Sequence, residues 1–298
     1  MRKNYFILLL LVAPLSIFAQ DEAEKEETPD GWHKAGNISL LFNQAAFNAE
    51  WTGGGTSNYA ANLTLNYDFN YKQGKLLWDN RIMADYGITK TKDQEFTRKT
   101  NDRLEFNSLL GRQINESNWY YSLFLNFKTQ FTSGYEYFED TMGNEARLET
   151  TKFMSPGYLQ FGPGMLWKKN ENLKVNIAPA TARLIFVDDV FTTTLGYMDG
   201  DYFGVDAGES TRFEFGAAIS GYAKFNAMEN ISIENVLNLY SNYLEDPQNI
   251  DIDYTLNVVM TVNKWISANA TFQAIYDDNA VQGFQIREAL GIGVTYAF

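Results

Sequence analysis

The feature that most constrains the fold of this chain is a strict two-residue alternation of apolar and polar side chains. It is clearest over residues 59–71, where the odd positions read Tyr59, Ala61, Leu63, Leu65, Tyr67, Phe69 and Tyr71 and the even positions from Ala60 to Asn70 are mostly polar. Successive side chains of a β-strand point to opposite faces, so a period of two predicts a strand. A short polar turn at 72–75 leads to a second alternating segment, and the two predict a hairpin.

The same pattern recurs to the end of the chain and predicts about twelve strands. We expect them at 35–49, 57–71, 76–90, 103–113, 119–131, 157–168, 173–186, 212–225, 231–243, 250–262, 266–276 and 284–298. Short connectors alternate with longer ones at 91–102, 132–156 and 187–211. Strands of this length, with short turns on one side and long loops on the other, are typical of outer-membrane barrels. The sequence therefore predicts an all-β fold, a transmembrane antiparallel up-and-down β-barrel over residues 32–298.

The first thirty residues predict export. Arg2 and Lys3 precede an apolar run that ends in Ala19, which is typical of a signal peptide over 1–19. The run is too short for a transmembrane helix. Residues 20–31 are rich in Asp and Glu and lack apolar periodicity, so we expect an acidic disordered linker. Together these features predict an integral protein of the cell outer membrane, exported through the general secretory pathway.

Composition excludes several function classes. The net charge of -13 argues against nucleic-acid binding, and the absence of Cys excludes disulfides and thiolate chemistry. His33 is the only histidine and lies in the lead-in to the first expected strand, which disfavours a serine nucleophile with a histidine base. A mechanism that uses carboxylates alone stays open. We expect no enzymatic activity and no cofactor.

The last expected strand carries an assembly signal. Its residues Leu290, Ile292, Val294, Tyr296 and Phe298 share one apolar face and end on an aromatic residue at the carboxy terminus. This pattern resembles the terminal signal that the barrel-assembly machinery of outer membranes recognises. The alternative is an ordinary edge strand of a soluble barrel. A second irregular feature is a change of parity near Pro179 to Thr181, which predicts a β-bulge because proline cannot donate to a ladder.

The polar faces of the strands carry charges of both signs that we expect in the lumen. They are Asp79, Arg81, Asp85, Arg103, Glu105, Lys128, Lys174, Arg183, Arg212, Glu214, Lys224, Glu234, Asp251, Asp253 and Arg287. Ion pairing across strands is one interpretation, and a polar pore that selects solutes is the other. Bulky side chains of the same parity, such as Met83, Phe124 and Tyr240, favour a narrow or filled lumen.

Loop 187–211 holds six acids and no Lys or Arg. It suits either a divalent cation on the outer face or a set of solvated carboxylates. Reading from Asp199 as the start of a calcium loop puts Phe203 where an oxygen ligand belongs, so the pattern is a weak match.

Four segments resemble a known family: Trp51 to Gly54, Thr129 to Tyr135, Met154 to Tyr158 and Ala178 to Arg183. Together they are similar to an uncharacterised domain-of-unknown-function family of outer-membrane barrels in Bacteroidota-type bacteria, from about Trp32 to the carboxy terminus. The resemblance implies localisation and fold, and no functional residue.

Two functions therefore remain open at this level. One is a structural or interaction component of the envelope, whose partners would be outer-membrane lipid and lipopolysaccharide, the barrel-assembly machinery and envelope proteins. The other is a narrow solute channel.

Overall fold

The computed structural model describes residues 29–298 except 49, 51, 53, 54 and 278. The expected signal peptide and nearly all of the expected linker lie outside the described residues. The chain divides into two units, Met1–Asp30 and Gly31–Phe298, and the barrel is the second. No helix in the described part of the chain is long and apolar enough to cross a membrane.

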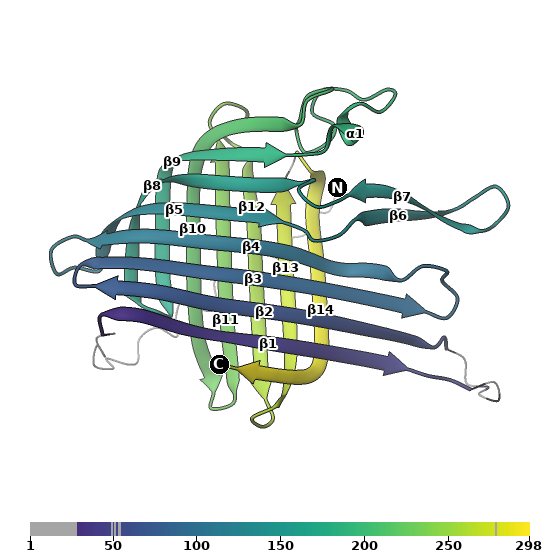
Figure 1. Cartoon of the computed structure of the whole chain (residues 1–298), viewed down its shortest axis with the longest axis horizontal. Helices are drawn as coiled ribbons and strands as arrows, with labels where there is room; N and C mark the ends of the chain where they lie inside the picture. Colours follow the sequence, from purple (N-terminus) through teal and green to yellow (C-terminus); the bar gives the residue numbers. More distant parts are fainter. Residues whose placement is uncertain (1–28, 49, 51, 53–54, 278) are drawn as a thin grey trace, which may run out of the picture. The chain divides into compact units, whose positions relative to one another are not determined.

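The second unit is a closed antiparallel β-barrel, as the sequence predicts (Figure 1). The barrel strands are β1 (Gly31–Ala45), β2 (Asn58–Gln73), β3 (Leu76–Thr91), β4 (Arg98–Gln113), β5 (Trp119–Thr129), β8 (Gly157–Asn170), β9 (Leu173–Phe186), β10 (Thr211–Met228), β11 (Ile231–Asn242), β12 (Ile250–Thr261), β13 (Ile266–Asp277) and β14 (Val281–Ala297). Each pairs with its neighbours in chain order, and β1 pairs with β14 to close the ring. Short connectors lie at one end, which we call the turn end, and longer ones at the other, which we call the loop end.

Several boundaries and elements differ from the sequence-based expectation. The first strand begins and ends four residues earlier than expected, and β4 begins at Arg98. Most of the added residues at the starts of both strands pair with their neighbours although they break the alternation. Within the expected loop 132–156, β6 (Gly134–Glu139) and β7 (Glu145–Thr151) form a separate two-stranded sheet. Within loop 187–211, the short helix α1 (Asp189–Thr192) begins after its capping residue Asp188.

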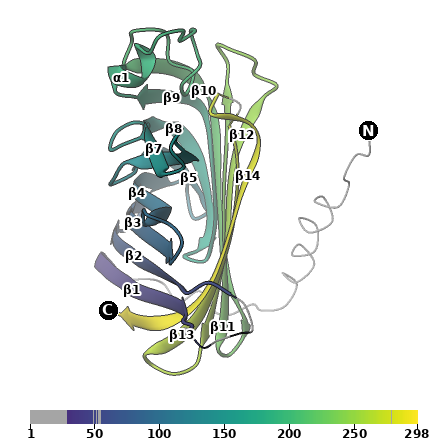
Figure 2. The same cartoon turned by 90° about the vertical axis from the view of Figure 1, so that its right-hand side faces the viewer.

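The barrel consists of two walls whose strands cross. Strands β1 to β5, β8 and β9 form one wall, and β10 to β14 form the other. Figures 1 and 2 show the two walls running in different directions. Strands that turn a corner between crossing sheets commonly do so at a bulge. At the corner between β9 and β10 the register shifts between Gly216 and Ala218, opposite Pro179 to Thr181, which confirms the predicted bulge. A Cβ on Gly216 would lie 1.8 Å from the carbonyl oxygen of Ser241, so this corner requires glycine.

Side chains from the two walls meet in the space between them. Phe124, Ala178, Ala218 and Tyr240 form a buried cluster that joins β5 and β9 to β10 and β11, and Leu109 packs against it. Large apolar residues on the other parity point outward, and Leu290 on β14 is 72% exposed. The apolar face of each strand thus lies outside, and the polar faces enclose a small internal core.

Candidate functional site in the barrel lumen

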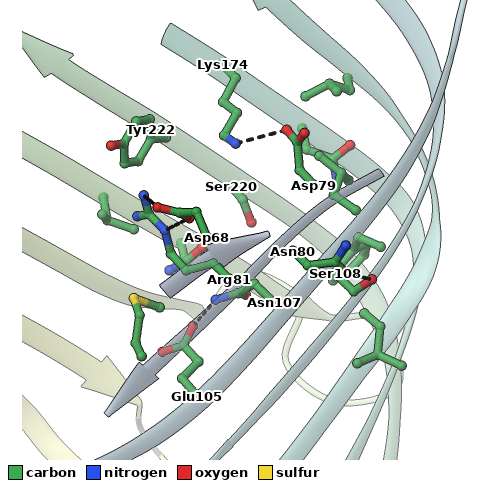
Figure 3. Close-up of a pocket in the computed structure, with 18 of the residues that line it drawn as sticks. Asp68, Asp79, Asn80, Arg81, Glu105, Asn107, Ser108, Lys174, Ser220 and Tyr222 are labelled. Atoms are coloured by element: carbon green, nitrogen blue, oxygen red, sulfur yellow. Dashed lines mark hydrogen bonds and ion pairs between the residues drawn. The ribbon is translucent and has the colours of Figure 1, made fainter. Parts of the chain in front are cut away.

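The lumen nearest the turn end holds a carboxylate between two lysines. Asp79 on β3 is buried, and its Oδ2 lies 2.9 Å from the Nζ of Lys168. The same oxygen lies 3.2 Å from the Nζ of Lys174 (Figure 3). Lys168 also pairs with Glu171 at 2.8 Å. Strands β8 and β9, which carry these lysines, are not neighbours of β3 in the barrel. The group therefore ties distant strands together across the interior.

A second group, centred on Arg81 of β3, reaches from one wall to the other. Its Nε lies 2.6 Å from Asp68 Oδ1 on β2, and its Nη1 lies 3.8 Å from Glu234 Oε2 on β11. The guanidinium also stands 5.1 Å from the ring centre of Tyr222 on β10, whose hydroxyl donates to Glu234 at 2.9 Å. A cation over an aromatic face is attracted by the ring quadrupole. Arg81 is thus held by a carboxylate on its own wall and by two groups on the other.

A cavity of about 150 Å³ lies between these two groups. Figure 3 shows charged and amide side chains around it, and apolar side chains such as Phe124 and Leu166 also line it. The volume exceeds that of a single water molecule, and a cavity of about this size can bind a benzene ring. It can therefore hold several waters or a small solute.

A further ion pair in the lumen joins opposite walls. Lys128 Nζ on β5 lies 2.6 Å from Asp253 Oδ2 on β12. Gln273 on β13 donates to the other oxygen of Asp253 at 3.1 Å. On the neighbouring strand β4, Arg103 Nη2 lies 2.8 Å from Glu105 Oε2. Positive and negative side chains therefore lie next to one another in this part of the lumen. Because β5 and β12 are not neighbours, the Lys128–Asp253 pair bridges the lumen itself.

The lumen nearest the loop end is the most buried part of the network. Glu214 is completely buried and lies 2.5 Å from Arg183 Nε and 2.9 Å from Arg212 Nε. Arg183 Nη1 also lies 2.5 Å from Asp251 on β12, and Arg212 pairs with Glu245 beyond the strand. Such charges are tolerable without water only because each has partners of opposite sign.

Most of the sequence-predicted lumen charges enter these groups. Asp85 pairs in register with Arg103 on β4, and Arg287 on β14 pairs in register with Gln273. Lys224 shares the face of Tyr222 but is exposed near the end of β10, because the strand extends past the filled part of the lumen. Sequence reasoning omitted Asp68 and Lys168, although the parity of Asp68 in the 59–71 pattern places it on the polar face.

Loop 187–210 is fixed at the loop end of the barrel, against residues 150–155. Tyr202 donates to the carbonyl oxygen of Thr150 at 2.7 Å, and Ile185, Val187 and Val205 form a small core beneath it. Burial raises the pKa of Tyr202 to about 12. Lys152 Nζ lies 2.5 Å from Asp188 Oδ2, and the hydrogen bond from this lysine lowers the pKa of Asp188. The loop is therefore a structured cap.

The acids of this cap serve local turns. Asp188 accepts from the backbone N–H of Val190, Asp199 from that of Ala207 and Asp201 from that of Met198. In the described part of the chain no group of three or more acids, histidines or cysteines is arranged to hold a metal ion.

The β6–β7 hairpin is braced by cations over rings. Arg147 lies 4.2 Å from the ring centre of Tyr135 and 4.6 Å from that of Phe96. Glu145 pairs with Arg98 and accepts from the backbone N–H groups of Glu95 and Phe96. Burial raises the pKa of Glu145, but these hydrogen bonds and the arginine lower it further, so the pKa ends below its ordinary value. The hairpin is thus anchored to the connector before β4.

The fold is a closed twelve-stranded antiparallel β-barrel whose lumen carries groups of paired charges. Residues 42–135 match the family described as "Protein of unknown function (DUF3078)". This match covers less than half of the chain. No curated protein matches the sequence.

Several solved outer-membrane barrels are similar in structure. The outer membrane channel COG4313 from Pseudomonas putida F1 has a TM-score of 0.39 at 11% identity, over 94% of this chain and 100% of that chain. The translocator domain of the autotransporter NalP from Neisseria meningitidis has a TM-score of 0.41 at 8% identity, over 92% and 90%. The NanC porin has a TM-score of 0.36 at 11% identity, over 88% and 98%. These similarities concern the fold and not the function.

Proposed function

We propose that this protein is an outer-membrane barrel with a structural or interaction role in the envelope, and that it does not conduct solutes. The observation that carries the proposal is the Lys128–Asp253 ion pair, with 2.6 Å between Nζ and Oδ2, on strands of opposite walls. This pair narrows the path that a solute would take through the barrel. The Phe124, Ala178, Ala218 and Tyr240 cluster narrows it further.

The outer surface supports a membrane location. At the turn end, outward rings contact one another around the barrel: Trp32 lies 5.8 Å from Trp78, and Trp265 lies 6.0 Å from Tyr296. Aromatic girdles of this kind anchor barrels at the membrane–water interface. Between this girdle and the loop end the outward residues are mostly apolar, as Leu63, Leu123 and Ile219 illustrate. A closed barrel leaves few backbone groups unpaired, which suits a strand protein to lipid.

Partners follow from the same placement. The exterior would contact outer-membrane lipid and lipopolysaccharide, and the apolar face of β14 that ends in Phe298 would be read by the assembly machinery after general secretory export. Most lumen charges are paired with one another, which supports a role without catalysis.

The test is a planar-bilayer recording on the purified full chain. We expect no single-channel steps in membranes whose protein content is verified by flotation and by heat-dependent migration on an unboiled gel. Stable steps from the wild-type protein would contradict the proposal.

The alternative function is a narrow solute channel, and the cavity of about 150 Å³ beside Arg81 favours it. If the protein conducts, Arg81→Gln should shift its ion selectivity, because the guanidinium lines that cavity. An unchanged selectivity would place conduction elsewhere.

A further inference from the structure

Strand β14 has an edge that its neighbour β1 does not cover. It pairs with β13 from Val281 to Val294, but with β1 only from Ile292 to Ala297. Figure 1 shows the reason: β14 runs along β13, then bends sharply to lie beside β1. A Cβ on Gly293 at this bend would lie 2.0 Å from the carbonyl oxygen of Leu40, so the seam is tight only at the turn end. We call residues 284–291 the open edge.

The open edge is exposed on both of its faces. Outward residues Phe284, Ile286 and Leu290 are exposed, and so are Gln285 and Ala289, which have the lumen parity. By contrast, Gln273 on β13, which faces the lumen beside the open edge, is buried. The barrel wall is therefore interrupted between β1 and β14 toward the loop end.

We propose that the open edge docks an extended β-strand of a second, different polypeptide. This proposal rests on the proposed function, because it names the surface through which a membrane-embedded barrel would act as an interaction component. Backbone N–H and C=O groups in hydrocarbon must be paired internally, and lipid chains offer no partner for them. A strand added at the edge supplies both donors and acceptors.

The chain's own β1 is a poor occupant. Continuing the register from Phe42 opposite Ile292 would place Gln44 opposite Leu290 and Asn48 opposite Ile286. The outward face of β1 thus becomes polar where that of β14 stays apolar, and β1 ends at Ala45.

A second copy of this chain also fits badly. If the open edges of two copies paired antiparallel with each other, a two-fold axis perpendicular to the sheet would relate the copies. Because the sheet stands upright in the membrane, that axis would lie in the membrane plane. That axis would turn one copy upside down, whereas all copies insert with the same orientation. The partner strand is therefore from another protein.

The edge also specifies the chemistry of the incoming strand. Its outward side chains would be apolar, opposite Ile286 and Leu290, because they would face lipid. Its lumen-facing side would carry a carboxylate near Arg287, whose Nε is buried and has no hydrogen-bond partner among the described residues. Glu288 on the outward face disfavours a second acid there.

The first experiment asks whether the edge stays open in cells. The chain has no cysteine, so engineered pairs report cleanly. Ser39→Cys with Thr295→Cys is the positive control, because these hydroxyl oxygens lie 2.5 Å apart at the seam. We expect a disulfide there and none between Ala45→Cys and Ala289→Cys, which would face each other if β1 continued along β14. A disulfide at the second pair would overturn the proposal.

The second experiment identifies the occupant in the native membrane. Photoreactive benzoylphenylalanine replaces Phe284, Ile286 or Leu290 in turn, and Ile219 on β10 is the matched control, since it is outward and exposed. We expect severalfold more protein adduct at the three edge positions, with the attachment sites in strand order along one extended segment of one protein. Adducts with lipid alone, or scattered over unrelated proteins, would overturn docking. If the protein gives no channel steps in the bilayer recording and no adducts, only this inference is overturned. If it gives stable channel steps, the proposed function is overturned.

Discussion

The completely buried carboxylate of Glu214 provides a quantitative test of the filled lumen. Glu214→Gln keeps the shape of the side chain and removes its charge from two guanidinium groups, those of Arg183 at 2.5 Å and Arg212 at 2.9 Å. Removing one partner of a buried ion pair costs about 3 to 5 kcal/mol, because the remaining charge is left uncompensated. Arg183 keeps Asp251, which argues for the lower part of that range.

The assay is urea unfolding of the full chain in detergent micelles, followed by tryptophan fluorescence. With a denaturant dependence of about 3 kcal/mol/M, the midpoint should fall by about 1 to 1.7 M. Asp188→Asn is the control, because this carboxylate pairs with Lys152 in the exposed cap, and we expect its midpoint to stay close to that of the wild type. If both variants unfold at the same midpoint, water solvates the lumen charges and the reasoning behind a closed barrel is refuted.

Three further predictions test the seam, the core and the cap. Gly293→Ala should abolish the compact band of the folded barrel on an unboiled gel, because the new Cβ would lie 2.0 Å from the Leu40 carbonyl oxygen. Gly221→Ala is the control and should preserve the band, because its Cβ would meet no atom closer than 4.0 Å. Phe124→Ala should lower the free energy of unfolding by about 3 to 5 kcal/mol in the same urea assay, and a loss below that of a surface substitution would show that the cluster is not packed. The pKa of Tyr202 is raised to about 12, so the stability contributed by its protonated form is complete below about pH 10 and is lost as the pH rises through 12. Limited proteolysis of loop 187–210 should accelerate in that window, and Tyr202→Phe should remove the pH dependence.

The strand pattern was predictable because alternation reports directly on a two-sided wall. The even residues around Asp68 and the odd residues around Asp79 were each assigned to the polar face from parity alone, and both carboxylates lie in the lumen network. The bulge was predictable for a similar reason, since Pro179 lacks the N–H that a ladder requires.

The pairing of the lumen charges was not predictable from the sequence. Lys128 and Asp253 are separated by more than a hundred residues, and parity says only that both point inward. Which inward charges meet depends on how the walls cross, which is a property of the closed ring. The β6–β7 hairpin escaped detection because its strands lack a simple apolar face, and its Arg147 packs on Phe96 of a different connector.

The crossing of the two walls explains both the closed lumen and the open edge. A round barrel of twelve strands is wider than one of eight, whose interior side chains already fill the space, so it would leave room along its axis. Crossing the walls brings β3 close enough to β11 for Arg81 to reach Glu234, and β5 close enough to β12 for Lys128 to reach Asp253. The same crossing requires strands that turn corners. At its corner β10 stays paired with β9 through a bulge. At its corner β14 leaves the open edge, residues 284–291, without pairing to β1. A conformational change that made the barrel round would separate the Lys128–Asp253 pair and close the open edge at the same time. We therefore expect any change that lets the barrel conduct to remove the open edge as a docking surface as well.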